Sequence, residues 1–292
     1  MTVFARIAPK PTLPLELVET VIAFLSSESK SLRAASLTSR TWVSICRAHL
    51  FRRIVLHWCD EGSRRSDSLY TLLTRNPRIA KYIHELSIHE GLISSKHSHI
   101  TFCFAQSSTL PKLLPLLPQL HHIEFRASTL TPWCELNEEL VHALMRTIAT
   151  SSALKEVVLG SWNFASQLGA LDALLTVIAK NATTLSLTDI ATPFELAHSQ
   201  ALVARRYSEH LQCHATLQSL VINEGEVSSL PFYTNWFLQK PTRIRCLHLT
   251  CSTMQMNVSE FLSVLGELLE HLELNVRTGT RYEALFDVNE EH

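Results

Sequence analysis

Apolar residues recur along most of the chain in a short pattern. In blocks of six residues the first, fourth and sixth positions are apolar, and eight such blocks follow one another with their starts 25 to 37 residues apart. The blocks begin at Phe51, Ile83, Leu120, Leu154, Ala182, Leu217, Ile244 and Leu269, the Ala182 block being the weakest. Apolar side chains two positions apart are typical of a strand with one buried face. The pattern therefore predicts eight short strands, each with its fifth and seventh side chains on the opposite face.

Most gaps between these blocks hold segments with the period of an amphipathic helix. Examples are residues 68–74, 137–150, 164–181, 195–214 and 258–268. A unit of one strand and one helix cannot bury its apolar face alone, whereas stacked units share a continuous core. The blocks therefore predict an α/β fold in which a curved parallel sheet carries outer helices. A generic α/β domain remains the alternative, because such an apolar pattern also arises by chance.

Two regions interrupt this rhythm. Residues 91–118 begin with a polar stretch that predicts an exposed loop and end with a Leu- and Pro-rich stretch that predicts irregular helix or turns. Residues 127–136, which include Pro132 and Trp133, predict a second loop. The tail, residues 278–292, is polar and acidic at its end and is expected to fray.

The start of the chain has helical rather than strand periodicity. Apolar residues at positions 14, 17, 18, 21, 22 and 25 predict a first helix. A second helix should begin near Leu32, and a third should carry Trp42, Ile45 and Leu50 on one face and run directly into the first strand. Because three short helices enclose little core, their apolar surface must be completed by the rest of the chain or by a partner.

This helical segment resembles an F-box. The residues that carry the resemblance are Leu13-Pro14-x-Glu16-Leu17, Ile22, Leu25, Leu32, Ala35-Ser36, Arg40-x-Trp42 and Leu50-Phe51-x-x-Ile54. It departs from the family at Thr38-Ser39, where Val-Cys is more frequent, and in the loop 26–31, which lacks the usual Asp.

The eight blocks resemble an irregular leucine-rich-repeat solenoid, as found behind the F-box in many fungal-type F-box proteins. They lack the Asn or Cys that regular repeats carry at the ninth position, where Trp162 is one of the residues present instead. The implied division is an N-terminal arm at 1–10, an F-box at 11–56, a repeat domain at 51–277 and an acidic tail at 278–292.

The resemblance implies a non-catalytic substrate receptor of an SCF-type cullin-RING ubiquitin ligase. The F-box would bind the Skp-type adaptor, and through it a cullin, with contacts at Leu13, Pro14, Leu17, Ile22, Leu25, Leu32, Arg40 and Trp42. The alternatives are a helical cap on the repeat domain and an F-box/repeat scaffold that acts outside any ligase. Exposure of Leu13 and Leu17 would favour the ligase, and burial of both against the repeats would favour the scaffold.

The predicted partner of the repeat domain is a protein of unknown identity. Its candidate contacts lie at the fifth and seventh positions of the strands: Glu124, Arg126, Val158, Val221, Asn223, His248 and Glu273. A plain solvated sheet face is the open alternative.

Composition excludes several other classes of function. The chain has 292 residues, a formal net charge of -1 and only isolated Arg doublets, so we expect no nucleic-acid partner. It has no apolar run of about 20 residues and no secretory signal, so we expect no membrane partner and a cytoplasmic or nuclear location. Seven cysteines without a Cys-x-x-Cys pair indicate reduced thiols.

Candidate chemistry outside binding is sparse. Of the 15 histidines, the densest Cys/His group is Cys246-x-His248-x-x-Cys251, and His97-x-His99 lies in a predicted loop. Neither has the four-ligand spacing of a structural zinc site. No nucleophile elbow, paired zinc-protease histidines or phosphate loop occurs. We therefore expect no metal, no cofactor and no catalytic residues.

Overall fold

A computed structural model of the chain describes residues 13–58, 62–90, 107–193, 216–224, 229–240, 242–251 and 257–276. The chain divides into two compact units, Met1–Arg53 and Ile54–His292. The expected arm at 1–10, the polar start of the loop at 91–118, the helix at 195–214 and the acidic tail at 278–292 lie outside the described residues.

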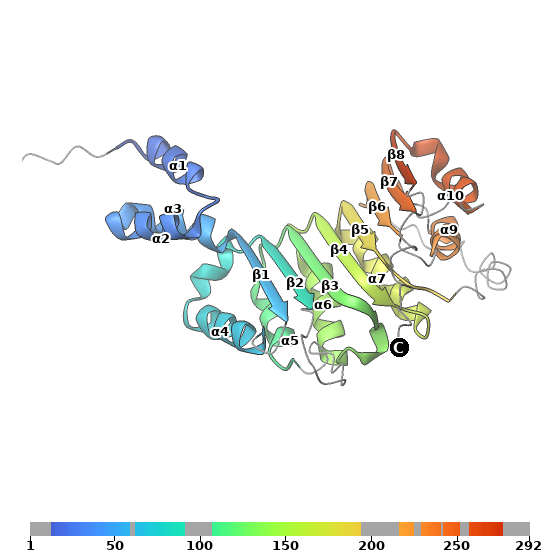
Figure 1. Ribbon diagram of the computed structural model, residues 1–292, viewed down its shortest axis with the longest axis horizontal. Helices are drawn as coiled ribbons and strands as arrows, with labels where there is room; N and C mark the ends of the chain where they lie inside the picture. The colour runs from blue at the N-terminus through green and yellow to red at the C-terminus, as the bar shows by residue number, and fades with distance from the viewer. Residues whose placement is uncertain are drawn as a thin grey trace, which may run out of the picture. The chain divides into compact units, whose positions relative to one another are not determined.

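The first unit consists of the three predicted helices (Figure 1). Helix α1 spans Leu15–Phe24, α2 spans Ser29–Thr38 and α3 spans Arg40–Arg52. Pro14 precedes α1, where a proline costs no helical hydrogen bond. Ser39 separates α2 from α3 in extended conformation, and its hydroxyl accepts a hydrogen bond from the amide of Thr41.

The core of this unit is small. Val18, Ile22, Leu32, Ala35 and Cys46 are buried, and Leu25, Trp42, Ile45 and Leu50 pack against them while keeping part of their surface exposed. This agrees with the expectation that three short helices enclose few side chains.

The second unit is built on one eight-stranded sheet whose strand order equals the sequence order (Figure 1). The strands are β1 (Arg53–Trp58), β2 (Glu85–Glu90), β3 (His122–Pro132), β4 (Glu156–Asn163), β5 (Thr184–Thr188), β6 (Ser219–Asn223), β7 (Cys246–Cys251) and β8 (His271–Val276). Neighbouring strands from β2 to β8 pair in parallel. Every strand begins two residues after the first apolar position of its block.

The register of the sheet follows the apolar pattern. The fourth positions pair across the sheet as Leu86, Ile123, Val157, Leu185, Leu220, Leu247 and Leu272. The sixth positions pair as Ile88, Phe125, Leu159, Leu187, Ile222, Leu249 and Leu274. In β2 to β7 both rows are buried, which confirms that this face is the core of the unit.

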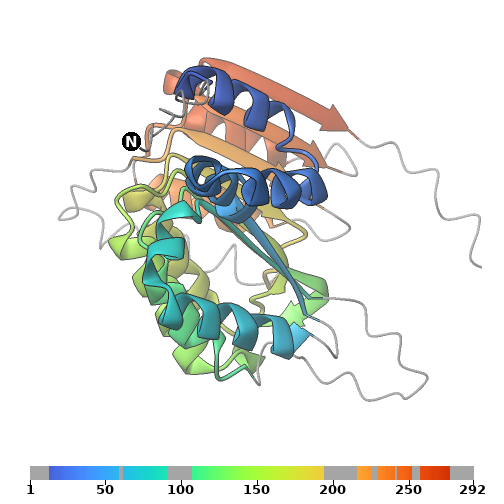
Figure 2. The same cartoon turned by 90° about the vertical axis from the view of Figure 1, so that its left-hand side faces the viewer.

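Helices cover this core on one side of the sheet (Figures 1 and 2). They are α4 (Gly62–Arg75), α5 (Leu110–Leu113), α6 (Glu138–Thr150), α7 (Leu168–Asn181), α9 (Leu230–Gln239) and α10 (Asn257–Leu265), with short 3-10 turns such as Pro77–Tyr82 and Gly266–Leu268. In the part of the chain that the structure describes, no helix has the length and apolar content required to cross a bilayer.

The prediction of a loop at 127–136 is wrong. Strand β3 continues to Pro132, and its pairing with β4 is irregular between Arg126 and Thr131. Trp133 follows in a 3-10 turn and is 2% exposed. The segment therefore belongs to the core, because a buried tryptophan anchors it.

That tryptophan is part of an aromatic cluster formed by residues of β3 and β4 and of the segments that follow them. Trp162 stacks on Phe125 with ring centroids 4.8 Å apart, and Trp133 stacks on Phe164 at 4.7 Å. The indole of Trp162 donates a hydrogen bond of 2.9 Å to the backbone carbonyl of Phe125. Trp162 occupies the ninth position of its block, and its contacts with Phe125 therefore link this block to the preceding one.

The last strand differs from the others. Leu272, Leu274 and Val276 of β8 are 42%, 44% and 39% exposed. The fourth and sixth positions of the eighth block lie in the same rows as Leu247 and Leu249, on the predicted core side, but in the described part of the chain they are exposed. The physical reason is that β8 is the last strand of the sheet, so its apolar face has a neighbouring strand on one side alone.

Candidate functional site

The first candidate surface lies on α1 and its flanks. Leu17, Val21 and Phe24 follow one another at intervals of three or four residues, so they lie on one stripe of α1, and Leu13 precedes the helix. All four are exposed, and Phe24 is 82% exposed. The adjacent face of the same helix carries Val18 and Ile22, which are buried in the core of the unit. We call the exposed residues Leu13, Leu15, Leu17, Val21, Phe24 and Leu37 the apolar surface of the first unit.

The residues predicted to contact an adaptor divide into three groups. Leu13, Pro14, Leu17 and Arg40 are exposed. Leu25 and Trp42 are half-buried at the edge of the core, and they keep some surface. Ile22 and Leu32 are 0% and 1% exposed, so their predicted role as contact residues is corrected. They support the surface by holding α1 and α2 in place. Phe24 and Leu37, both more exposed than Leu13 and Leu17, were not among the predicted contacts.

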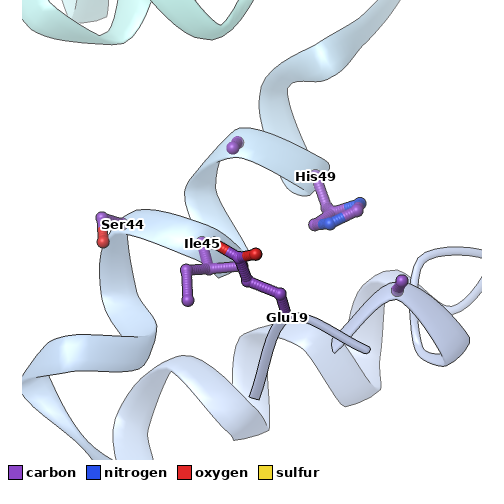
Figure 3. Close-up of a pocket in the computed structure, with 6 residues that line it drawn as sticks. Glu19, Ser44, Ile45 and His49 are labelled. Carbon is purple, nitrogen blue, oxygen red and sulfur yellow. The ribbon is translucent and has the colours of Figure 1, made fainter. Parts of the chain in front are cut away.

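A shallow groove runs between α1 and α3 (Figure 3). Its volume is about 490 Å³, and it is lined by Glu19 and Ala23 of α1 and by Ser44, Ile45, Ala48 and His49 of α3. Glu19 reaches from α1 toward α3 (Figure 3). Small and apolar side chains therefore make the floor of the groove, with Glu19 and His49 as the groups able to form charged hydrogen bonds.

The second candidate surface is the sheet face opposite the core, which we call the open face. The fifth positions pair as Ser87, Glu124, Val158, Ser186, Val221, His248 and Glu273, and the seventh as His89, Arg126, Gly160, Thr188, Asn223, Thr250 and Asn275. All seven residues predicted to contact a target lie in these two rows. Val158 is 7% exposed, so its predicted role as a contact residue is corrected.

Toward β2, the open face carries a charged cluster around Glu124. The Nε2 atom of His89 lies 3.0 Å from one oxygen of this carboxylate, and the Nε atom of Arg126 lies 3.2 Å from the other. Arg126 crosses Gly160, where an added Cβ would lie 2.8 Å from Cγ of Arg126. Burial raises the pKa of Glu124, but the nearby polar side chains of His89 and Ser87 and the charges of His89 and Arg126 outweigh it and leave this pKa below its ordinary value.

Toward β8, the open face carries a second cluster that consists of His248, His271 and Glu273. One nitrogen or oxygen of each side chain lies within 4.8 Å of those of the other two. Nδ1 of His248 lies 2.7 Å from Oε2 of Glu273. Hydrogen bonds from Asn275 and from His248, with the charge of His248, lower the pKa of Glu273. The sequence analysis predicted His248 and Glu273 separately as target contacts and did not include His271. The signal that could have found it is the His-x-Glu spacing in a strand.

The cysteines of the densest Cys/His group in the sequence do not join this cluster as a pair. Cys251 is buried on the core face, where burial and the charge of Glu224 raise its pKa. Burial likewise raises the pKa of Cys46 in the first unit. Both groups are therefore protonated thiols at neutral pH, a form that is a poor nucleophile and a poor metal ligand.

No protein-family model matches the chain, and no curated protein matches it.

Proposed function

We propose that this chain is an F-box protein that serves as the substrate-recognition subunit of an SCF-type ubiquitin ligase. The observation that supports this most strongly is the apolar surface of the first unit. Six large apolar side chains within residues 13–37 are exposed, and three of them share one stripe of α1. Contiguous exposed apolar surface on a folded unit is typical of a protein-binding site.

The energetics favour a docking role for this surface. Fully burying one Leu or Phe side chain stabilises a complex by about 1.5–3 kcal/mol. Several such side chains, offered by a helix whose other face is fixed in a core, can form the apolar centre of an interface. In the proposed function the adaptor buries this surface, and Arg40, exposed at the start of α3, supplies a directional polar contact.

The second unit is proposed to be the leucine-rich-repeat receptor for a target protein. Among the described residues of this unit, the strands follow the sequence order and the helices lie on the other side of the sheet from the open face. A target bound there would be held near the conjugating enzyme that the cullin recruits, and the rate of transfer would increase through proximity and orientation. The chain itself would supply no catalytic group. Such a role would be carried out in the cytosol or the nucleus.

Co-purification tests this proposal. The full chain is expressed with the Skp-type adaptor and a cullin, as wild type and as a Leu17→Asp, Phe24→Asp double variant. Leu238→Asp is the matched control, because Leu238 is 61% exposed on α9 of the second unit. We expect wild type and control to retain adaptor and cullin, and the folded double variant to lose both.

Two other outcomes would contradict the ligase role. If folded wild type does not retain the adaptor, the first unit is a helical cap on the sheet. If it retains the adaptor without a cullin, the chain is a scaffold that acts outside the ligase.

A further inference from the structure

The end of the open face at β7 and β8 brings together side chains that metal ions bind. In the register of these strands, Cys246 pairs with His271 and His248 pairs with Glu273. All four positions lie on the same face, because residues two apart in a strand share a face. Neighbouring strands of a sheet lie about 4.7–4.9 Å apart, so residues paired on one face are close neighbours. The pairing of β7 with β8 therefore creates a cluster of Cys, His and carboxylate groups from residues 25 positions apart in the sequence.

Three of these groups already converge. The ligand atoms of His248, His271 and Glu273 lie within 4.8 Å of one another, and the imidazole rings of the two histidines are 5.5 Å apart. Ligands of a tetrahedral zinc ion with bonds of 2.0–2.2 Å stand roughly 3.4 Å from one another. Small side-chain rotations would therefore bring the three ligand atoms to the distances that an ion requires. The ion would take the place of the hydrogen bond between Nδ1 of His248 and Oε2 of Glu273.

A fourth residue orients the carboxylate. The side-chain amide of Asn275 donates a hydrogen bond of 3.0 Å to Oε1 of Glu273, while Oε2 faces His248. Outer groups that hydrogen-bond a ligand in this way fix its orientation and increase metal affinity.

A comparable pair elsewhere on the sheet lacks the third ligand. Nδ1 of His122 lies 2.9 Å from Oε2 of Glu156, across β3 and β4. The pairing is the same as that of His248 with Glu273, but among the described residues no third His, Cys or carboxylate converges on it. The arrangement at β7 and β8 therefore differs from an ordinary cross-strand ion pair.

We propose that His248, His271 and Glu273 bind a divalent first-row transition-metal ion at the β8 end of the open face. Two imidazoles and a carboxylate suit zinc and its neighbours, whereas magnesium and calcium prefer ligand sets made of oxygen atoms. Three protein ligands leave a coordination position for water or for a donor from a bound protein. The ion also links β8, whose apolar face is exposed, to the neighbouring strand.

Isothermal titration calorimetry of the full-length protein with Zn²⁺ tests the proposal. Because other histidines can bind zinc weakly, the zinc stoichiometry and affinity of each variant are compared with those of wild type. Circular dichroism verifies that each variant is folded. Wild type should bind one Zn²⁺ more than His271→Gln and one more than Glu273→Gln. Asn275→Ala should weaken this site by about tenfold or more. His122→Gln, the matched control, should bind like wild type, and Mg²⁺ should give no signal at the site.

The proposal is overturned if His271→Gln keeps the zinc stoichiometry and affinity of wild type, or if His122→Gln loses as much as His271→Gln. If His271→Gln misfolds, the zinc binding of Glu273→Gln and Asn275→Ala decides whether the proposal holds. The inference is independent of adaptor binding, because its residues lie in the second unit and the adaptor surface lies in the first.

Discussion

Replacement of Trp162 by Phe tests how the second unit is held together. Trp162 is 0% exposed, stacks on Phe125 and meets the edge of Trp133 with ring centroids 5.2 Å apart. Its indole donates the 2.9 Å hydrogen bond to the carbonyl of Phe125. Phenylalanine keeps an aromatic ring in the cluster but removes the donor and leaves part of the indole volume empty.

The expected loss of stability is about 3 kcal/mol. A net hydrogen bond contributes about 1 kcal/mol. The two weakened aromatic contacts contribute roughly another 1 kcal/mol, within the range of about 0.5–1.5 kcal/mol for one such pair. The residual cavity accounts for a further ~1 kcal/mol, since cavities cost about 24 cal/mol per Å³.

Urea unfolding followed by far-ultraviolet circular dichroism measures this loss. The signal does not depend on the deleted indole, and an unchanged slope with a lower midpoint reports a change in stability alone. Leu238→Ala is the control, because exposed side chains usually contribute less than about 0.5 kcal/mol. A Trp162→Phe midpoint equal to that of wild type would refute the inference that this cluster fixes the irregular ends of β3 and β4.

Three further predictions follow from other positions. Ile22→Ala should destabilise the first unit by about 2–5 kcal/mol because Ile22 is buried, while Phe24→Ala should change its stability by less than about 0.5 kcal/mol because Phe24 is exposed. Protease susceptibility measures both changes, and equal effects would contradict the assignment of core and surface. Because Glu124 has a lowered pKa in the folded chain, its carboxylate stabilises the fold at pH values above its ordinary pKa of 4.5, and this stabilisation is lost as the pH falls through the folded value. Wild type should therefore be more stable to urea than Glu124→Gln at neutral pH. A difference in stability that does not shrink in acid would contradict the lowered pKa. Asn137→Ala should lower the free energy of unfolding in urea by about 1 kcal/mol, because the Asn137 side chain accepts a 2.8 Å hydrogen bond from the amide of Glu139 at the start of α6. An unchanged free energy of unfolding would show that this cap is dispensable.

The sequence was sufficient to predict the sheet in the second unit. Inward side chains at the fourth and sixth positions are shared by all blocks, and a shift of one residue would expose every one of them. The register of Leu86 with Ile123 and Val157 follows directly from that constraint. The three helices of the first unit could be predicted equally well from the sequence, because helical periodicity is a property of neighbouring residues in the chain.

Features that depend on tertiary packing could not be predicted in the same way. Pro132 and Trp133 are typical of a loop in sequence, yet Trp133 packs against Phe125 of β3 and Trp162 of β4. Helix α9, which starts at Leu230, was not predicted.

The cluster of His248, His271 and Glu273 was missed for the same reason. His271 and His248 come together through the pairing of two strands that the local spacing of Cys246, His248 and Cys251 does not reveal. Burial of Ile22 rather than Leu17 likewise depends on where α3 packs against α1.

The affinity of the full chain for purified Skp-type adaptor tests the central claim most directly. Calorimetry should show a saturable complex with wild type and with Leu238→Asp, and binding at least about 100-fold weaker with Leu17→Asp, Phe24→Asp. That factor corresponds to roughly 3 kcal/mol, which is the loss expected when two apolar contacts are replaced by charges. Absence of binding by folded wild type, or equal binding by all three proteins, would contradict the assignment of the apolar surface of the first unit as the adaptor site.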